Sequence, residues 1–241
     1  MNQPHLLTLI KNGRELPLAT QNYPSRGQTA VQKLYQTSEG KLFYKEVSKI
    51  NHTYCRINVD DGSLAEREYW AQQLAKALGL NVPDLWMINA NTTIQRWLDY
   101  PDGRLYASSQ GVMNLLPANI FDCALFDWLT GQVDRHNANY LYNYGKCEII
   151  LIDSAHCFLK YSGSLPDYLE KFEISQNREL HKWRESKLKD RLSKLTSAKL
   201  RKLVPLRNPL EAHALEFRLN ELKTINSIHE IIQLYRESHH D

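Results

Sequence analysis

The sequence predicts a two-lobed α+β protein, because strand patterns with one helix occupy residues 1–98 and helical patterns dominate residues 99–241. The chain has 241 residues, of which 42% are hydrophobic and 24% charged, enough to bury one large core or two lobes sharing an interface. The cleft between two such lobes is where a ligand is most often bound.

The N-terminal lobe is expected to begin with an antiparallel meander. Residues 16–20 form a short apolar segment, and residues 29–36 mix β-branched with aromatic side chains. Residues 38–40, Ser-Glu-Gly, suit a hairpin turn, so residues 41–47 should return as the next strand. The loop over residues 22–28 then lies at one tip of the meander.

One helix is predicted over residues 63–79 of this lobe. Ser63 and Glu66 have the spacing of a capping box, and apolar residues follow on one broad side. Gly79 lies near the expected C-terminal end, and Pro83 prevents the helix from continuing. The helix therefore has both of its ends marked in the sequence.

Two short strands, over residues 85–88 and 93–98, complete the N-terminal lobe. The pattern then becomes helical, and residues 120–129 repeat apolar side chains at helical spacing. Two further strands, over residues 140–142 and 148–152, bracket a turn. The remaining residues are expected to be helical.

A basic segment over residues 178–207 contains eleven lysines and arginines against three acidic residues, while the whole chain has a net charge of +3. Such a segment attracts phosphates, an anionic membrane surface or an acidic partner. The alternative is an amphipathic helix around residues 182–202 that packs on the second lobe, with Leu188, Leu192 and Leu195 inward.

Composition and motif content argue against several classes of protein. The four cysteines (Cys55, Cys123, Cys147 and Cys157) are far apart and lack metal-ligand spacing, which argues against a zinc site or a disulfide scaffold. We find no secretory signal and no apolar run of roughly 20 residues that could span a bilayer. We expect a cytoplasmic protein without a nucleic-acid partner; delivery into a host cell as an effector, and the oligomeric state, stay open.

The strongest chemical signal is the run GQVDRHNAN over residues 131–139, followed by ILID over residues 150–153. A helix ends, and its exit loop presents an acid, a base and an amide, after which an apolar strand delivers a second acid. Carboxylate and amide oxygens are ligands that Mg²⁺ prefers. Phosphoryl transfer needs this metal and a group that positions the attacking hydroxyl.

The pattern D-R-H-x-x-N followed by I-D resembles the catalytic and metal-binding loops of phosphatidylinositol 3- and 4-kinases and their relatives, including HipA-like kinases and atypical kinases of the secretory pathway. Residues 68–83, from Glu68 to Pro83, are similar to a helix and the following strand in bacterial and type II lipid-kinase branches. The resemblance covers roughly residues 20–160. It implies a protein-kinase-like fold with a β-rich N-lobe, one key helix and a helical C-lobe.

The resemblance implies roles for the matched residues. Lys45 would hold the α- and β-phosphates of ATP and pair with Glu68. Asp134 would orient or deprotonate the acceptor hydroxyl, and His136 would steady the transferring phosphate or help as a base. The metal ligands, for Mg²⁺ or alternatively Mn²⁺, would be Asn139 and Asp153. The nucleotide would also contact Ser25, Arg26, Gly27, Gln28, Gln95, Trp97 and Leu98.

Several of these residues also have simpler interpretations. Lys45 could be a surface lysine, and Asp134 and Asn139 could cap a loop through backbone hydrogen bonds. His136 could be structural. Arg135 fits an organiser of the loop, through a carboxylate or carbonyl partner, better than a ligand for substrate.

Two features depart from the family pattern. Ala155 stands where the family usually has glycine two residues after the metal-binding aspartate, which restricts the backbone of that loop. The phosphate-binding loop has a single glycine, Gly27, which is weaker than a G-x-G-x-x-G pattern. Neither departure removes a catalytic group.

These features predict an ATP- and Mg²⁺-dependent kinase that transfers phosphate to an alcohol. The leading acceptor is a Ser, Thr or Tyr hydroxyl of a protein, and a phosphoinositide or soluble inositol phosphate is the alternative. A basic cleft beside Asp134 would favour the inositol compound, and a groove of mixed polarity would favour a peptide. Two further hypotheses are a catalytically inactive kinase fold that serves as a binding module, and a kinase fold that transfers AMP.

Overall fold

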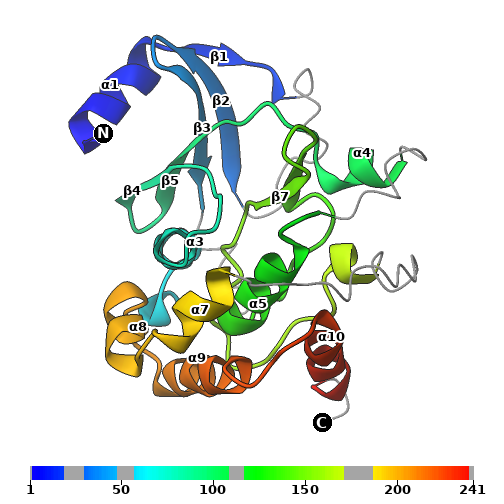
Figure 1. Cartoon of the computed structure of the whole chain (residues 1–241). Coiled ribbons are helices and arrows are strands. Elements are labelled where there is room, and N and C mark those ends of the chain that lie inside the picture. Colours follow the sequence, from blue (N-terminus) through cyan, green and yellow to red (C-terminus); the bar gives the residue numbers. More distant parts are fainter. Residues whose placement is uncertain (1, 19–29, 48–56, 109–116, 171–186, 239–241) are drawn as a thin grey trace.

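The computed structural model describes residues 2–18, 30–47, 57–108, 117–170 and 187–238 (Figure 1). The predicted fold class is confirmed, since a five-stranded antiparallel sheet forms the N-terminal lobe and helices form most of the C-terminal lobe. The predicted phosphate-binding residues Ser25, Arg26, Gly27 and Gln28 lie outside the described residues. Within those ranges, we find no helix with the length and apolarity needed to cross a bilayer.

The sheet has the strand order β1-β2-β3-β5-β4, with every neighbouring pair antiparallel. The strand predicted over residues 16–20 is misplaced: β1 already ends at residue 16, because Pro17 offers no N–H group to extend the ladder. Gly40 closes the predicted β2–β3 hairpin with a φ of 101°, a conformation that suits glycine. The strands are β1 (Arg14–Leu16), β2 (Val31–Thr37), β3 (Gly40–Glu46), β4 (Leu85–Asn89) and β5 (Thr92–Arg96).

A helix absent from the sequence prediction, α1 (Gln3–Asn12), covers one face of this sheet. An asparagine N-cap and an early proline start the helix. Leu6 and Leu9, three positions apart, pack against Leu42 and Ile94 of the sheet. The helix therefore exists because a short apolar stripe finds a sheet face to cover.

Alternation along β3 decides which side chains face the second lobe. Leu42 and Tyr44 lie on the α1 side of the sheet. Phe43 and Lys45 lie on the opposite side and line a pocket between the lobes. A one-residue change of register would exchange the two sets. The pairing of β3 with β2 and β5 therefore fixes where the Lys45 ammonium group is presented.

The helix predicted over residues 63–79 is α3 (Leu64–Ala77), which packs on β4, β5 and α8. Its capping box is formed as predicted: the Ser63 hydroxyl accepts a hydrogen bond from the Glu66 backbone N–H, and the Glu66 carboxylate accepts one from the Ser63 N–H at 2.9 Å. Glu66 is thereby used at the helix end, and Glu68 is the acid that faces Lys45.

In the C-terminal lobe, the prediction of a single basic helix around residues 182–202 is wrong for the part that the structure describes. The chain ends one helix at Ser193 and starts another after Thr196, whose hydroxyl caps it. The helices of this lobe are α4 (Gly103–Ser108), α5 (Ile120–Thr130), α7 (Lys187–Ser193), α8 (Ser197–Leu203), α9 (Pro209–Leu222) and α10 (Ile228–Glu237), with a hairpin of β6 (Tyr140–Asn143) and β7 (Glu148–Leu151).

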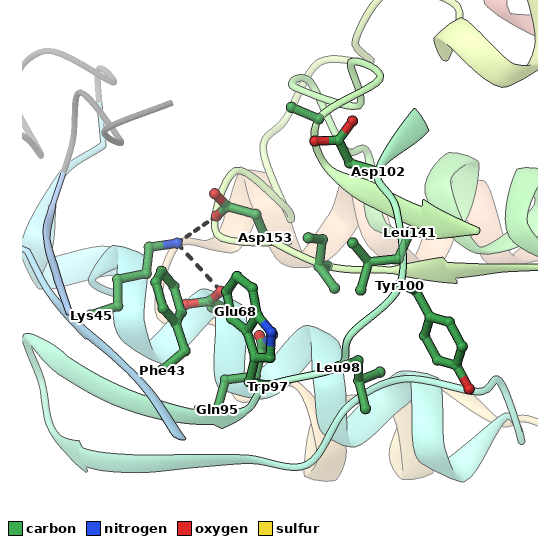
Figure 2. Close-up of a pocket in the computed structure, with 12 residues that line it drawn as sticks. Phe43, Lys45, Glu68, Gln95, Trp97, Leu98, Tyr100, Asp102, Leu141 and Asp153 are labelled. Carbon is green, nitrogen blue, oxygen red and sulfur yellow. Dashed lines mark hydrogen bonds and ion pairs between the residues drawn. The ribbon is translucent and has the colours of Figure 1, made fainter. Parts of the chain in front are cut away.

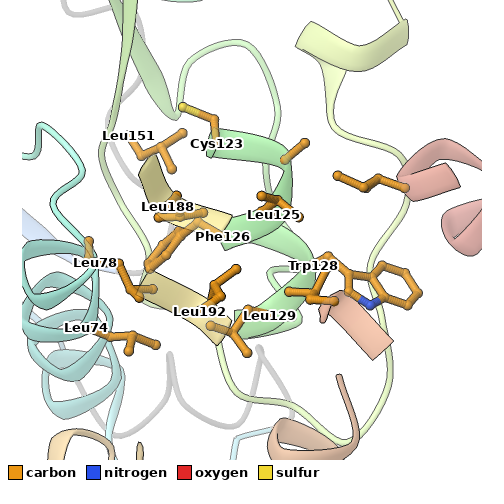
Figure 3. Packing of buried hydrophobic residues seen from close by; sticks show 14 of the residues in the cluster. Leu74, Leu78, Cys123, Leu125, Phe126, Trp128, Leu129, Leu151, Leu188 and Leu192 are labelled. Atoms are coloured by element: carbon orange, nitrogen blue, oxygen red, sulfur yellow. The ribbon is translucent and has the colours of Figure 1, made fainter. Parts of the chain in front are cut away.

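The main hydrophobic core surrounds α5, in which every residue except Asp122 is buried, and this helix packs against α7, α9 and α10. Figure 3 shows Leu74 of α3 and Leu78 at its C-cap on the same side of the cluster as Leu188 and Leu192 of α7, which lie next to α5. Trp128 lies in this core, as one interpretation of the sequence predicted. One core therefore joins α3 to the C-terminal lobe.

We expect Leu129→Ala to lower the free energy of unfolding by about 2–5 kcal/mol, because the Leu129 side chain is fully buried in this core. Urea denaturation followed by circular dichroism measures the change. Leu210→Ala is the matched control, since Leu210 is 62% exposed and its removal should change stability by less than about 0.5 kcal/mol. Equal losses in the two variants would contradict the assignment of the core.

Candidate active site

A pocket lies between the sheet and the C-terminal lobe (Figure 2). Charged side chains occupy one end, around Lys45 and Asp153, while Leu98 and Tyr100 lie at the other end. A slot with apolar walls and a charged end suits a ligand with a flat ring and an anionic tail. The lining residues are Phe43, Lys45, Glu68, Gln95, Trp97, Leu98, Tyr100, Asp102, Ala138, Leu141, Ile152 and Asp153.

Lys45 joins the two lobes through its ammonium group. The Nζ atom lies 3.4 Å from Glu68 Oε1 on α3 and 2.5 Å from Asp153 Oδ1 after β7. Its side chain is only 6% exposed, so the interpretation of Lys45 as a surface lysine is wrong. A buried ammonium group needs such compensation, because transfer of an unpaired charge from water costs several kcal/mol.

The two acids respond differently to this shared lysine. Burial would raise the pKa of Asp153, but the nearby Lys45 ammonium outweighs it and holds that pKa below its ordinary value. Burial raises the pKa of Glu68, with Lys45 opposing the rise and the charge of Asp153 adding to it. The Thr93 hydroxyl donates a 3.3 Å hydrogen bond to Glu68. Asp153 is therefore the acid that Lys45 stabilises most strongly as a carboxylate.

Arg135 organises the loop, as the sequence predicted. Its Nε and Nη2 atoms each donate to the Asp127 carboxylate at 3.0 Å. Its Nη1 donates to the carbonyl oxygens of Asn139 at 2.6 Å and Ile152 at 2.5 Å, and its Nη2 also donates to the Ser154 hydroxyl at 2.9 Å. Burial alone would lower the pKa of Arg135, but Asp127 reverses that effect and raises it. One side chain thus holds α5, the loop and the end of β7 together.

The loop begins where α5 ends, at Gly131. This glycine adopts a left-handed conformation with a φ of 57°, and a Cβ atom there would lie 2.6 Å from the Arg218 guanidinium. Arg218 donates 3.1 Å hydrogen bonds to the carbonyl oxygens of Leu129 and Leu159. Burial lowers the pKa of Arg218 to about 10. Glycine is therefore required both for the turn and for the space that Arg218 fills.

Asp134 is half-exposed beside two histidines. His136 Nε2 lies 3.8 Å from Asp134 Oδ1, and His156 Nδ1 lies 3.5 Å from Asp134 Oδ2. His136 was among the predicted site residues, whereas His156 was missed. The only available signal for His156 was its position three residues after Asp153, because its contact with Asp134 depends on the path of the loop.

Asn139 and Asp153 are the predicted metal ligands. The Asn139 amide nitrogen donates to the Asp134 carbonyl at 2.7 Å, so its side-chain oxygen is the atom that would face a metal. The Ile152 N–H donates to the Asn139 carbonyl at 3.2 Å, which places the two ligand-bearing segments side by side. Among the described residues, no cluster of three His, Cys, Asp or Glu could hold a metal alone. Two oxygen ligands fit Mg²⁺ whose shell is completed by phosphates and water.

The predicted nucleotide contacts Gln95, Trp97 and Leu98 all line the pocket. Asp102 and Phe43 line it too but were missed by the sequence reasoning. Asp102 is buried and accepts hydrogen bonds from the Arg104 backbone and guanidinium at 2.9 and 3.0 Å. An Asp-Gly pair is common in ordinary turns, so no local signal marks Asp102 as part of a site.

No protein family and no curated protein matches this sequence. Solved kinase structures of low sequence identity resemble the fold. A proinflammatory kinase of Helicobacter pylori, CtkA, has 13% identity and a TM-score of 0.48, covering 94% of this chain and 97% of that one. The Rio2 kinase of Chaetomium thermophilum, in an ADP/Mg²⁺–phosphoaspartate complex, has 16% identity and a TM-score of 0.43, covering 83% and 69%.

The kinase domain of maize SIRK1, bound to AMP-PNP, has 11% identity and a TM-score of 0.38, covering 96% of this chain and 87% of that one. All three TM-scores lie below 0.5.

The burial of His156 predicts a pH dependence of stability. Burial lowers the pKa of His156 below its ordinary value of 6.5, with Lys45 and His136 acting in the same direction and Asp153 and Asp134 opposing them. The unfolded chain then takes up a proton at a higher pH than the folded protein. The contribution of His156 to the free energy of unfolding is therefore complete above pH ~6.5, and it is lost as the pH falls through the lowered pKa.

We therefore expect His156→Gln to reduce the loss of unfolding free energy between about pH 7.5 and pH 5, measured by urea denaturation without divalent metal. His213→Gln, at an exposed position on α9, is the control and should follow the wild type. Identical pH profiles for His156→Gln and the wild type would contradict the burial of a neutral imidazole.

Proposed function

We propose that this chain is an ATP- and Mg²⁺-dependent kinase that phosphorylates a protein hydroxyl. The observation that carries the proposal is the contact of Lys45 with both Glu68 and Asp153 at the charged end of an otherwise largely apolar pocket. A buried lysine shared by acids from two lobes provides a fixed positive charge where a polyphosphate would enter.

The pocket supports binding of a nucleotide. Phe43, Leu141 and Ile152 supply apolar surface for a purine ring, and Trp97 and Leu98 follow the end of β5 beside it. Lys45 would hold the phosphates, as a compact ammonium group does in other phosphate sites. Glu68 keeps the ammonium group in place from the α3 side.

The metal-binding residues would be Asn139 and Asp153. Bound Mg²⁺ supplies positive charge that neutralises the phosphate oxygens during transfer. The lowered pKa of Asp153 keeps its carboxylate ionised and ready to bind a cation. Asn139 would present its side-chain oxygen, because its amide nitrogen is bound to the Asp134 carbonyl.

Asp134 would orient the acceptor hydroxyl and take up its proton. The acceptor oxygen forms a bond to the γ-phosphorus, the bond from that phosphorus to the β–γ bridging oxygen breaks, and ADP leaves with the bond's electron pair. His136 and His156 flank the Asp134 carboxylate and can receive or return the proton. Arg135 maintains the position of the loop through Asp127.

The surroundings of Asp134 support a protein acceptor over an inositol phosphate. Its described side-chain contacts are His136, His156 and Asn139, which are polar but include neither lysine nor arginine. A polyanionic inositol compound calls for several lysines or arginines at the acceptor position. Retention of Lys45, Asp134 and Asp153 disfavours an inactive binding module.

We expect Asp134→Asn to lower kcat by at least ~10²-fold while leaving the affinity for ATP nearly unchanged, because a positioned base acts on the acceptor hydroxyl. The assay follows γ-labelled ATP into a protein fraction, into phosphoinositide vesicles and into soluble inositol phosphates, with calorimetry for ATP affinity. Asp190→Asn, an exposed acid on α7, is the control. Label in the lipid or inositol fraction alone would contradict the protein acceptor, and full activity of Asp134→Asn would exclude its role.

We expect Asp153→Asn to remove Mg²⁺-dependent turnover, with a loss of about 10²–10³-fold, since the metal supplies several kcal/mol of charge stabilisation. Titration of Mg²⁺ into the ATP-bound variant should show weakened metal binding. Asp84→Asn, an exposed acid just before β4 of the N-terminal lobe, is the matched control. Turnover and metal affinity equal to those of the wild type would refute Asp153 as a ligand.

A further inference from the structure

We propose that Arg67 and Arg207 are positioning residues of the active site, because they clamp α3 to the C-terminal helices and fix the rotation that brings Glu68 to Lys45. We call Arg207, Asn208 and Glu211, at the start of α9, the C-terminal clamp. This inference rests on the proposed function, since the Lys45–Glu68 pair matters for catalysis only if the pocket binds a nucleotide.

Three consecutive residues of α3 pair with residues from two parts of the molecule, the C-terminal clamp and β3. An α-helix turns by about 100° per residue, so Glu66, Arg67 and Glu68 point in three directions. Glu66 pairs with Arg207, Arg67 pairs with Glu211, and Glu68 pairs with Lys45. Rotation of α3 that removed Glu68 from Lys45 would therefore break two other ion pairs.

Of the two arginines that hold α3, Arg67 is the buried one. Its guanidinium lies 2.7 Å from Glu211 Oε2 on α9, and it donates 2.9 Å hydrogen bonds to the carbonyl oxygens of Gly62 and Cys157. Cys157 lies four residues after Asp153, so Arg67 connects α3 with the segment that carries the metal ligand. All of these partners are positioned by the C-terminal lobe or by the start of α3 itself.

Arg207, the second arginine that holds α3, is half-exposed to solvent. Its Nη2 lies 2.5 Å from Glu66 Oε1, and its guanidinium lies 6.0 Å from the centroid of the Trp70 ring. Asn208 donates a 3.0 Å hydrogen bond to Asp61, just before α3. Partial burial would raise the pKa of Glu66, but Arg207 and the Ser63 cap outweigh it and lower that pKa. Contacts of Asp61, Glu66 and Arg67 therefore hold the start of α3 against the C-terminal clamp.

Two ion pairs among the described C-terminal helices have neither partner on α3. Arg201 of α8 pairs with Glu216 of α9, and Lys194 pairs with Asp190. The clamp is therefore directed at the helical turn that carries Glu68. The part of the sequence after residue 160, which has no counterpart in the family resemblance, then takes part in forming the active site.

The test uses Arg207, because its side chain is half-exposed and its removal leaves the core intact. We expect Arg207→Ala to lower kcat/KM for ATP by about 3- to 30-fold, with Arg207→Lys recovering part of the loss. Arg201→Ala is the matched control, an exposed arginine on the same surface whose partner is not on α3, and it should keep wild-type activity. Hydrogen exchange of α3 amides should rise only in Arg207→Ala.

A double-mutant cycle separates positioning from general stability. If Arg207 acts through Glu68, Arg207→Ala should cause little further loss in a Glu68→Gln background. An equal loss in both backgrounds, or equal effects of Arg207→Ala and Arg201→Ala, would overturn the inference.

If the wild type transfers no phosphate, the proposed function is contradicted but the clamp is not. Hydrogen exchange would then test whether the clamp holds α3 in place. Faster exchange of α3 in Arg207→Ala but not in Arg201→Ala would support it, and unchanged exchange would refute it.

Discussion

The buried ion pair between Arg135 and Asp127 is the interaction on which the rest of the site depends. Both side chains are almost completely buried, and the Tyr168 hydroxyl adds a 2.7 Å hydrogen bond to Asp127. Asp127 belongs to α5, at the centre of the main core, while Arg135 holds the carbonyl oxygens of Asn139 and Ile152. Loss of one partner from such a pair typically costs about 3–5 kcal/mol, because the other charge stays buried without compensation. The loop is thereby connected directly to a helix at the centre of the core.

Local patterns explain which parts of the fold could be predicted. The hairpin at Gly40 and the capping box of Ser63 and Glu66 are decided by residues within a few positions of one another. The same holds for the buried helix α5. By contrast, α1 is stabilised by Leu42 and Ile94 far along the chain, and the leucines of α7 and α8 pack on other helices. Those outcomes depend on tertiary contacts that a window of sequence does not contain.

In the candidate site, too, some residues could be predicted from local patterns and others could not. Lys45, Glu68, Gln95, Trp97, Leu98 and Asp153 were predicted from a motif and its supporting segments, and the pocket brings them together. His156, Asp102 and Arg67 carry no comparable signal. Their placement follows from where a loop turns or which helix lies opposite, as with Arg67 and Glu211, which are 144 positions apart. A motif specifies the reacting groups, but long-range packing specifies their neighbours.

The segment that follows Asp153 is held by three arginines from different parts of the chain. Arg135 holds the Ser154 hydroxyl, Arg67 the Cys157 carbonyl and Arg218 the Leu159 carbonyl, while Ala155 packs into a small apolar cluster. Outward displacement of Asp153 would break several of these buried bonds together. Small molecules that bind only after such displacement would meet a high energetic cost, whereas molecules shaped for the apolar walls near Phe43 and Leu141 would fit the pocket without it.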